Sequence, residues 1–338
     1  MFSKKLGIDL GTANSIVYLQ GKGIVLNEPT VVAVTLDNQR VVAVGNEAKE
    51  MLGRTPGNII ASRPMRDGVI ADYQVTEAML RYFLQKVCGK SFLFRPEVMI
   101  CIPAGSTQVE RRAVEDATVS AGAKTVYVIH EPLAAAIGAG IPIAEASGNM
   151  IVDIGGGAAE SAVISLGGLV ISRSIRVGGN KIDDAIINLI RKKHGLVIGE
   201  TTAEEVKFKI GSAVSDKKQK KEEQTIEVKG RDSITGLPKR IEIDTDVVVE
   251  AVHQPLSQII NMIKQILEEI PPELASDIID KGIIMSGGTS LLRNFDKLLS
   301  AETGVPCYVA EEPMLCVAKG CGVALENLEL YKRSLIKK

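Results

Sequence analysis

The sequence has few of the residues that build covalent cross-links or transition-metal centres. Its five cysteines are odd in number and scattered, without a Cys-x-x-Cys pair, and its three histidines show no metal-ligand spacing. Scattered cysteines in apolar surroundings behave as small hydrophobic side chains rather than as a disulfide framework. These absences argue against a disulfide-rich secreted protein and against a zinc site, and they favour a reducing cytosol.

Long hydrophobic runs and an excess of charge of one sign are also missing. No uninterrupted apolar run is long enough to span a bilayer, and the first residues lead into a strand pattern without the apolar core of a signal peptide. The formal net charge of −1 argues against bulk electrostatic binding of nucleic acid. We therefore expect a cytoplasmic protein that binds no nucleic acid.

The composition that remains is that of a soluble globular protein. Hydrophobic residues make up 45% of the chain and charged residues 24%, which is typical of a folded domain with a packed core. The length of 338 residues is too great for one ordinary core and suggests about two domains.

One stretch of the chain occurs twice. Residues 7–19 read GIDLGTANSIVYL and residues 151–164 read IVDIGGGAAESAVI, each an apolar strand with one Asp, a turn of small residues and a second apolar strand. Either copy alone could be an ordinary hairpin with a Gly-rich turn. Two copies predict two related halves whose turns meet at a ligand site. Glycines let backbone N–H groups converge on an anion, and an Asp beside a phosphate indicates a divalent cation between them.

Local patterns predict several element boundaries. After the first hairpin, apolar segments up to residue 44 predict that the first sheet continues as a meander. Helix caps or capping boxes are expected at Thr76, Thr107, Asn180 and Thr202.

A second candidate site lies at residues 130–132. A strand at residues 126–129 delivers Glu131 to the mouth of a helix that has Pro132 at its first position. Ligands usually bind at such strand ends in open α/β sheets. The small residues at 134–138 indicate either simple tight helix packing or a bridge that moves between the two halves.

Four motifs in order carry a family resemblance: DLGT at residues 9–12, EP at 131–132 before an Ala-rich helix, DIGGG at 153–157 and SGGT at 286–289. Together they resemble the actin/Hsp70/sugar-kinase ATPase superfamily. Longer phrases, such as RPMRDGVIAD at 63–72 and PPEL at 271–274, resemble its MreB family of bacterial actin homologues, over essentially the whole chain.

The resemblance implies an actin-like α/β ATPase fold, with two duplicated α/β domains flanking a nucleotide cleft. It also implies four subdomains: IA at residues 1–32, 66–143 and 312–338, IB at 33–65, IIA at 144–179 and 246–311, and IIB at 180–245.

The same resemblance implies a site for ATP or ADP with Mg²⁺. Asp9 and Asp153 would hold the Mg²⁺, through its waters. Glu204 and Lys207 would contact ribose and base, although without the resemblance they could equally be a surface ion pair one helical turn apart. The full set of expected nucleotide contacts is Gly11, Thr12, Ala13, Asn14, Gly155, Gly156, Gly157, Glu204, Lys207, Gly287, Gly288 and Thr289.

The expected hydrolytic machinery is incomplete. Glu131 matches the family position that orients a water in line with the γ-phosphate. The second partner in the family is normally a Thr after the glycine turn, and here that position is Ala158; Ala159 also replaces a usual Thr. Loss of one positioned hydrogen bond in a transition state costs on the order of 10²-fold in rate. We therefore expect ATP binding with weak hydrolysis. Further departures from the family pattern are His130 and Asn180.

The resemblance further implies head-to-tail filaments, either single or paired, on the inner face of the cell membrane, with membrane-bound morphogenesis adaptors as partners. Phe92, Leu93 and Phe94 lie between Lys90 and Arg95, and they are either tucked under the domain or a membrane contact. The flanking cations suit an anionic lipid surface.

Three other functions share these motifs. A small-molecule kinase would need a base aimed at a substrate hydroxyl, and the sequence has no further carboxylate signature for one. An Hsp70-like chaperone would need a peptide-binding domain after the last helix. A fully active ATPase filament would need Glu131 to suffice without the missing hydroxyl.

Overall fold

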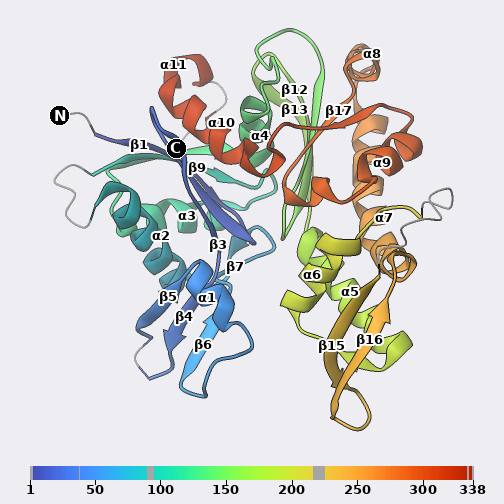
Figure 1. Ribbon diagram of the computed structural model, residues 1–338. Helices are drawn as coiled ribbons and strands as arrows, with labels where there is room; N and C mark the ends of the chain where they lie inside the picture. The colour runs from blue at the N-terminus through green and yellow to red at the C-terminus, as the bar shows by residue number, and fades with distance from the viewer. Residues whose placement is uncertain (1–2, 38, 90–94, 216–224, 333–334, 337–338) are drawn as a thin grey trace.

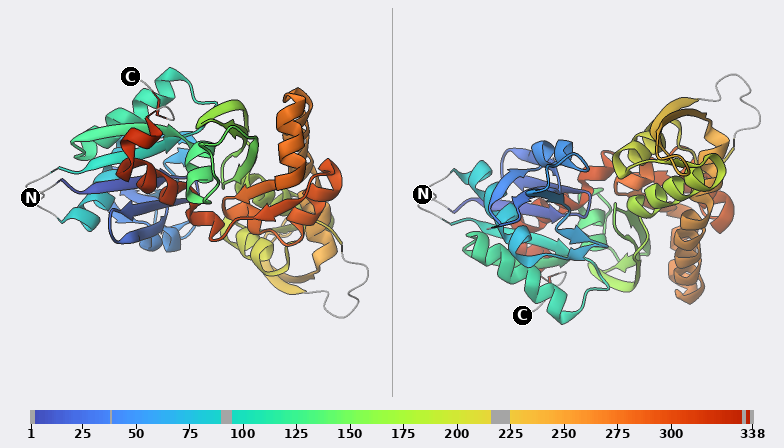
Figure 2. Two further views of the ribbon diagram at one scale, coloured as in Figure 1. Left: turned by 90° about the horizontal axis from the view of Figure 1, so that it is seen from above. Right: turned by 90° about the horizontal axis from the view of Figure 1, so that it is seen from below.

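The computed structural model of the chain describes residues 3–37, 39–89, 95–215, 225–332 and 335–336. Two lobes lie side by side, and both ends of the chain belong to the first lobe (Figure 1, Figure 2). Within the described residues, no helix is long and apolar enough to cross a membrane.

The two lobes are built on sheets with the same strand plan. The first sheet runs in the order β10-β9-β1-β2-β3, with β1 Lys5–Leu10, β2 Asn14–Leu19, β3 Gly23–Pro29, β9 Glu97–Ile102 and β10 Thr125–His130. The second runs in the order β13-β12-β11-β17-β18, with β11 Asn149–Ile154, β12 Ala159–Ser165, β13 Gly168–Ile175, β17 Ile283–Ser286 and β18 Cys307–Val309. In each, an antiparallel hairpin extends into a third antiparallel strand on one side and pairs with two parallel strands on the other. The duplication expected from the repeated stretch is present in this strand order.

Helices cover both faces of each sheet. In the first lobe they are α2 Tyr73–Cys88 and α3 Gln108–Ala121, and in the second α7 Thr245–Glu269, α8 Pro272–Lys281 and α9 Phe295–Thr303. Between the lobes lie α4 Glu131–Gly138 and α10 Cys316–Glu326, which is followed by α11 Leu328–Tyr331. Two short 3₁₀ turns complete the second half: η1 Gly288–Leu291 and η2 Pro313–Leu315.

One hydrophobic core joins the two lobes. Met99 and Ile129 from the first sheet pack in it with Ile151 and Ile164 from the second, together with the inner faces of α4 and α10. Successive side chains of a strand point to opposite faces of the sheet. Val98, next to Met99 on β9, therefore packs on the opposite face, in a core that belongs to the first lobe alone. We call the joining cluster the shared core.

The helices α4 and α10 approach each other through two glycines. A Cβ added to Gly320 would lie 1.8 Å from the carbonyl oxygen of Ala134, and one added to Gly138 would lie 1.8 Å from that of Cys316. No side chain fits at either position. The small residues at 134–138 therefore serve close packing against α10.

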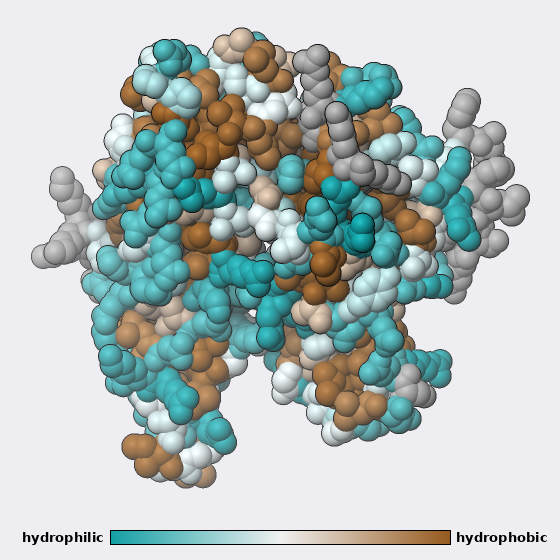
Figure 3. All heavy atoms as spheres, turned by 180° about the vertical axis from the view of Figure 1, so that it is seen from behind, coloured by the Kyte–Doolittle hydropathy of each residue, from teal (hydrophilic) through white to brown (hydrophobic). Residues whose placement is uncertain are grey.

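Each lobe carries a smaller sheet at its lower end in Figure 1. In the first lobe these elements are β4 Val32–Thr35, β5 Val41–Val44, β6 Ile59–Ser62 and α1 Asn46–Met51, with a short β7 Met65–Arg66 and β8 Val69–Ile70 hairpin above them. In the second they are β14 Leu196–Val197, β15 Ile226–Asp232, β16 Pro238–Ile243, α5 Gly179–His194 and α6 Glu200–Ile210. The surface is notched between these two lower ends (Figure 3).

The expected meander ends earlier than predicted. β4 pairs with β5 and β6 in a sheet of its own and not with β3. The chain leaves the first sheet at Thr30, whose N–H donates to the carbonyl of Ala13 at 2.9 Å and whose hydroxyl donates to that of Gly11 at 2.7 Å. These two bonds hold Thr30 at the first glycine turn, so the following strand starts a new sheet.

One of the four expected helix caps is confirmed. Thr107 forms a reciprocal capping box with Glu110 at the start of α3. The other three are wrong, because each helix begins before the expected residue: α2 is capped by Asp72, α5 follows Gly178 and α6 follows Gly199. Extended glycines begin two of these helices without a side-chain cap, which leaves no capping signal in the sequence.

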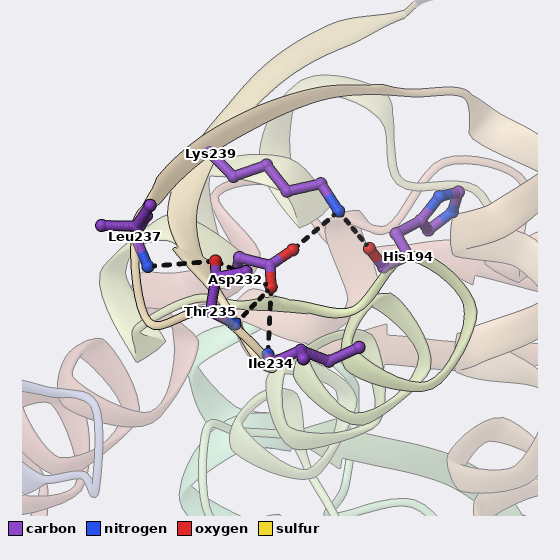
Figure 4. A network of polar contacts seen from close by, with 6 residues as sticks. All are labelled: His194, Asp232, Ile234, Thr235, Leu237 and Lys239. Carbon is purple, nitrogen blue, oxygen red and sulfur yellow. Dashed lines mark hydrogen bonds and ion pairs between the residues drawn. The ribbon is translucent and has the colours of Figure 1, made fainter.

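The β15–β16 turn is fixed by a polar network (Figure 4). Asp232 accepts backbone hydrogen bonds from Ile234 at 3.0 Å and Thr235 at 2.9 Å, and these bonds hold the pKa of its carboxyl well below the usual range. Lys239 donates to Asp232 at 3.1 Å and to the carbonyl of His194, at the end of α5, at 3.0 Å. The turn is thereby attached to a helix while Ile234 stays 92% exposed.

The α4–α10 contact generates a stability prediction. Gly320→Ala should lower the free energy of unfolding by about 3 kcal/mol, at the upper end for overpacking, because the added methyl meets rigid backbone. The measurement is the urea midpoint of the ligand-free protein. Gly57→Ala is the matched control, since a Cβ there meets nothing within 4 Å. Equal midpoints for Gly320→Ala and the control would contradict the packing argument.

Candidate functional site

A cleft of about 530 Å³ lies between the lobes and is lined by loops from both. This volume is within the usual range for sites that bind small molecules. Its lining includes the two glycine turns, the residue at the start of α4, the α6 helix and the turns η1 and η2. All residues expected to contact the nucleotide, to hold the metal or to belong to the hydrolytic machinery line it; they are Asp9, Gly11, Thr12, Ala13, Asn14, Glu131, Asp153, Gly155, Gly156, Gly157, Ala158, Glu204, Lys207, Gly287, Gly288 and Thr289.

The two glycine turns are in close contact with each other. A Cβ added to Gly156 would lie 2.6 Å from that of Ala13, and one added to Gly157 would lie 2.3 Å from the Thr12 hydroxyl. Thr12 in turn accepts a hydrogen bond from the backbone N–H of Gly68 at 2.9 Å, which brings a third loop to the same point. Only glycine allows this approach, so the turn sequence determines how closely the lobes meet.

The N–H groups of the second turn are not equivalent. The backbone N–H of Gly155 donates to the carbonyl of Ala158 at 2.9 Å, and this hydrogen bond closes the turn. The carbonyl of Gly155 accepts from the Thr289 hydroxyl at 2.9 Å, which ties the turn to η1. Gly155 therefore shapes the turn, and its N–H is already used within the chain.

Four carboxyl groups gather beneath the turns. Asp9 and Asp153 come from the paired hairpins, Glu131 from the start of α4 and Glu160 from β12. Asp153 accepts a hydrogen bond from the Ser286 hydroxyl at 2.6 Å. The backbone N–H of Ala104, in the first lobe, donates to both carboxyl oxygens of Glu160 at 3.1 Å. Glu160 thus connects the second lobe to the first at the base of the cleft.

The pKa values of all four carboxyl groups are raised. Burial, with the Asp153 charge, raises the pKa of Asp9 to about 7, and burial raises that of Glu160 to about 7. Burial, with the charges of Glu160 and both aspartates, raises the pKa of Glu131 well above its usual range. The pKa of Asp153 is also raised by burial. A group of buried like charges disfavours ionisation, so this region favours either protons or a cation.

The four carboxyl groups supply oxygen donors, which suit a hard cation such as Mg²⁺, and the Cys101 thiol lies beside them, with its Sγ 3.8 Å from Asp9 Oδ1. Across the described ranges, however, no three His, Cys, Asp or Glu side chains are placed to hold a metal ion directly. Mg²⁺ usually keeps several waters and is bound through one or two carboxylates, and the pair Asp9 and Asp153 fits that pattern.

The two neighbouring alanines face different surroundings. Ala158 lines the cleft, and a Cβ on Gly68 would lie 3.6 Å from its methyl. Ala159 is fully buried in the core of the second lobe. Of the two positions where the family usually has Thr, only Ala158 can contact a ligand.

The expected ribose contacts already have partners within the chain. Lys207 pairs with Asp183 at 2.8 Å and donates to the carbonyl of Gly179 at 3.1 Å. Glu204 pairs at 2.8 Å with Lys49 of α1, which belongs to the other lobe. Glu204 and Lys207 therefore do not form the surface ion pair that their spacing allowed.

Sequence reasoning missed four side chains of this region: Lys49, Glu160, Asp183 and Phe208. Glu160 carried a signal, because it is an acid inside an otherwise apolar or small-residue strand. The other three show no local pattern, since their partners and surroundings come from other elements. The expected membrane contact at Phe92, Leu93 and Phe94 lies outside the described residues.

Comparisons with known proteins agree with the geometry. The cell shape-determining protein MreB of Escherichia coli (strain K12) is 52% identical over 336 residues, which are 98% of this chain and 96% of that protein. The crystal structure of MreB5 of Spiroplasma citri bound to AMPPNP superposes with a TM-score of 0.92 at 35% identity, covering 98% of this chain and 99% of that one. A MamK double helical filament shares the fold, with a TM-score of 0.80 at 22% identity over 97% of this chain and 99% of that one.

The family model described as MreB/Mbl protein matches residues 3–333. The resemblance drawn from the motifs and the actin-like α/β fold expected from it are confirmed. On this match and on the identity to MreB of Escherichia coli, the chain belongs to the MreB/Mbl family.

Proposed function

We propose that this chain is an ATP-binding, actin-like cytoskeletal protein that polymerises into membrane-associated filaments controlling cell shape, and that it hydrolyses ATP weakly. The observation that carries the proposal is the contact between two glycine turns, one from each lobe, above a group of carboxylates. The bound AMPPNP in the Spiroplasma citri relative and the cell-shape role in the name of the Escherichia coli relative support it.

The β- and γ-phosphates of ATP would lie between the two turns. Backbone N–H groups of residues 11–14 would hold them from the first lobe, and those of Gly156 and Gly157 from the second. Gly155 would contribute by shaping its turn, because its N–H already donates to Ala158. A ligand held from both lobes stabilises the closed arrangement by binding it preferentially.

Asp9 and Asp153 would hold Mg²⁺ through its waters. When bound, the ion neutralises phosphate charge, and it relieves the repulsion among the buried carboxylates. Glu131 would orient the attacking water through its carboxyl oxygens. At the other end of the cleft, Glu204 and Lys207 would contact ribose and base, with Gly287, Gly288 and Thr289 lining the adenosine pocket.

The methyl of Ala158 provides no hydrogen bond for the attacking water. Glu131 is then the only expected orienting group, and we infer that polymerisation is gated by nucleotide binding more than by turnover. A filament that needs little hydrolysis requires another trigger for disassembly.

We further propose the four-subdomain division at the boundaries given above. Subunits would join head to tail, a contact that does not close on itself. Filaments would lie on the inner face of the cell membrane through Phe92, Leu93 and Phe94, beside membrane-bound morphogenesis adaptors.

The hydroxyl missing at position 158 generates a rate prediction. Ala158→Thr should raise phosphate release on the order of 10²-fold, because it restores one orienting hydrogen bond. Phosphate release with Mg-ATP and pelleting of polymers are measured in the same tube. Ala159→Thr is the adjacent control and should leave the rate unchanged, since that side chain is in the core. Adding Glu131→Gln to Ala158→Thr should remove the gain. No gain in Ala158→Thr refutes the explanation.

The segment at residues 92–94 generates a membrane prediction. Replacing Phe92, Leu93 and Phe94 together with Ser should abolish co-sedimentation with liposomes that contain anionic lipid, because the apolar anchor is removed. The matched control makes the same replacement with Ser at Ile234 and Leu237, which are 92% and 65% exposed at the β15–β16 turn. Lipid binding by the triple variant equal to that of the wild type rejects this assignment.

A further inference from the structure

The far end of the cleft carries three apolar side chains that none of the contacts above uses. Phe208 of α6 is 73% exposed, Leu291 of η1 is 56% exposed and Met314 of η2 is 39% exposed, and all three line the cleft. Single exposed apolar residues are ordinary on any protein surface. Here three exposed apolar side chains from different elements line one cleft, and exposed apolar surface that gathers in a cleft marks a binding site.

Backbone contacts fix the distance between the elements that carry these side chains. The residue after Gly211, at the end of α6, forms a β-bridge with Arg293, and the N–H of Ala213 donates to the Arg293 carbonyl at 2.8 Å. A Cβ added to Gly211 would lie 3.0 Å from the Leu292 side chain. The α6 helix and η1 therefore form one rigid corner of the cleft.

Met314 completes this corner from a third element. Its side chain lies over the glycine turn at 287–288, with Cγ 3.6 Å from the position of a Cβ on Gly288. A thioether is polarisable and packs well against aromatic rings. The corner thus has an apolar, polarisable surface at the 287–288 turn, and the Phe208 ring extends from the neighbouring helix α6.

Phe208 is the only aromatic residue among those that line the cleft in the described part of the chain. The ammonium of Lys207 lies 5.4 Å from its ring centroid and is itself held by Asp183 and the Gly179 carbonyl. An anchored cation beside an aromatic face restrains that ring. A flat, restrained ring suits a planar aromatic ligand better than it suits a sugar or a phosphate.

We infer that Phe208 stacks on the base of the bound nucleotide, with Leu291 and Met314 as apolar contacts for the same base. The inference rests on the proposed function, because it names the residue that holds the base of that nucleotide. Stacking on an aromatic side chain tolerates different bases, since every base has a π-face. Phe208 therefore strengthens the binding of purine nucleotides without selecting among them.

Truncation of the ring tests the inference directly. Phe208→Ala should raise the dissociation constants for Mg-ATP and Mg-GTP by the same factor, about tenfold, measured by equilibrium dialysis. Ile234→Ala removes an apolar side chain that is more exposed than Phe208 and does not line the cleft, and it should change neither constant. Phe208→Ala that binds ATP as tightly as the wild type overturns the inference.

A spectroscopic variant gives a second reading that does not depend on affinity. The chain contains no tryptophan, so Phe208→Trp places a single indole at the site. Mg-ATP should quench its fluorescence, inorganic tripolyphosphate should not, and Ile234→Trp should respond to neither. Unchanged emission in Phe208→Trp, when dialysis shows ATP bound, overturns the stacking. Failure of the wild type to bind ATP overturns the proposed function as well, whereas failure of the Phe208 variants alone overturns only the inference.

Discussion

The contact between the two glycine turns is the constraint on which the rest of the site depends. Gly156 and Gly157 meet Ala13 and Thr12 with no room for another carbon atom. Each turn follows a strand that carries an aspartate, so bringing the turns together also brings two carboxylates together. Crowding of like charges is therefore a direct result of the duplicated plan, and Glu131 and Glu160 increase it. This crowding raises the pKa values of the carboxyl groups, and the lobes are held together beside it by the apolar packing of the shared core.

The parts of the fold that follow local rules could be predicted from the sequence. The hairpins carry apolar strands broken by glycine, and the α3 capping box has both partners within one turn of helix, at Thr107 and Glu110. The starts of α5 and α6 could not be predicted, because an extended glycine begins each helix without a capping side chain. The separate sheet that begins at β4 also has no local signal, since the hydrogen bonds of Thr30 to the first turn decide it.

The candidate site was predictable in its composition and less so in its pairings. Motif order named the residues that line the cleft, but Lys49 and Glu204 are far apart in the sequence and meet only because the lobes face each other. Ala158 and Ala159 have the same side chain, and only their positions, just before β12 and at its first residue, decide that one faces the cleft and the other the core. The corner formed by Phe208, Leu291 and Met314 could not be predicted from the sequence, because its side chains come from three separate elements, α6, η1 and η2.

The glycine crossing of α4 and α10 gives the molecule the geometry of a lever. The lobes are joined there and in the shared core beside it, while the small sheets and α1 and α6 lie at the opposite end (Figure 1). A rotation of one lobe about the crossing displaces each atom in proportion to its distance from the crossing, so it moves α1 and α6 more than it moves the shared core. Lys49 and Glu204 link these two helices across the lobes, and their ion pair opposes such a rotation away from its axis, where a given force has a larger torque.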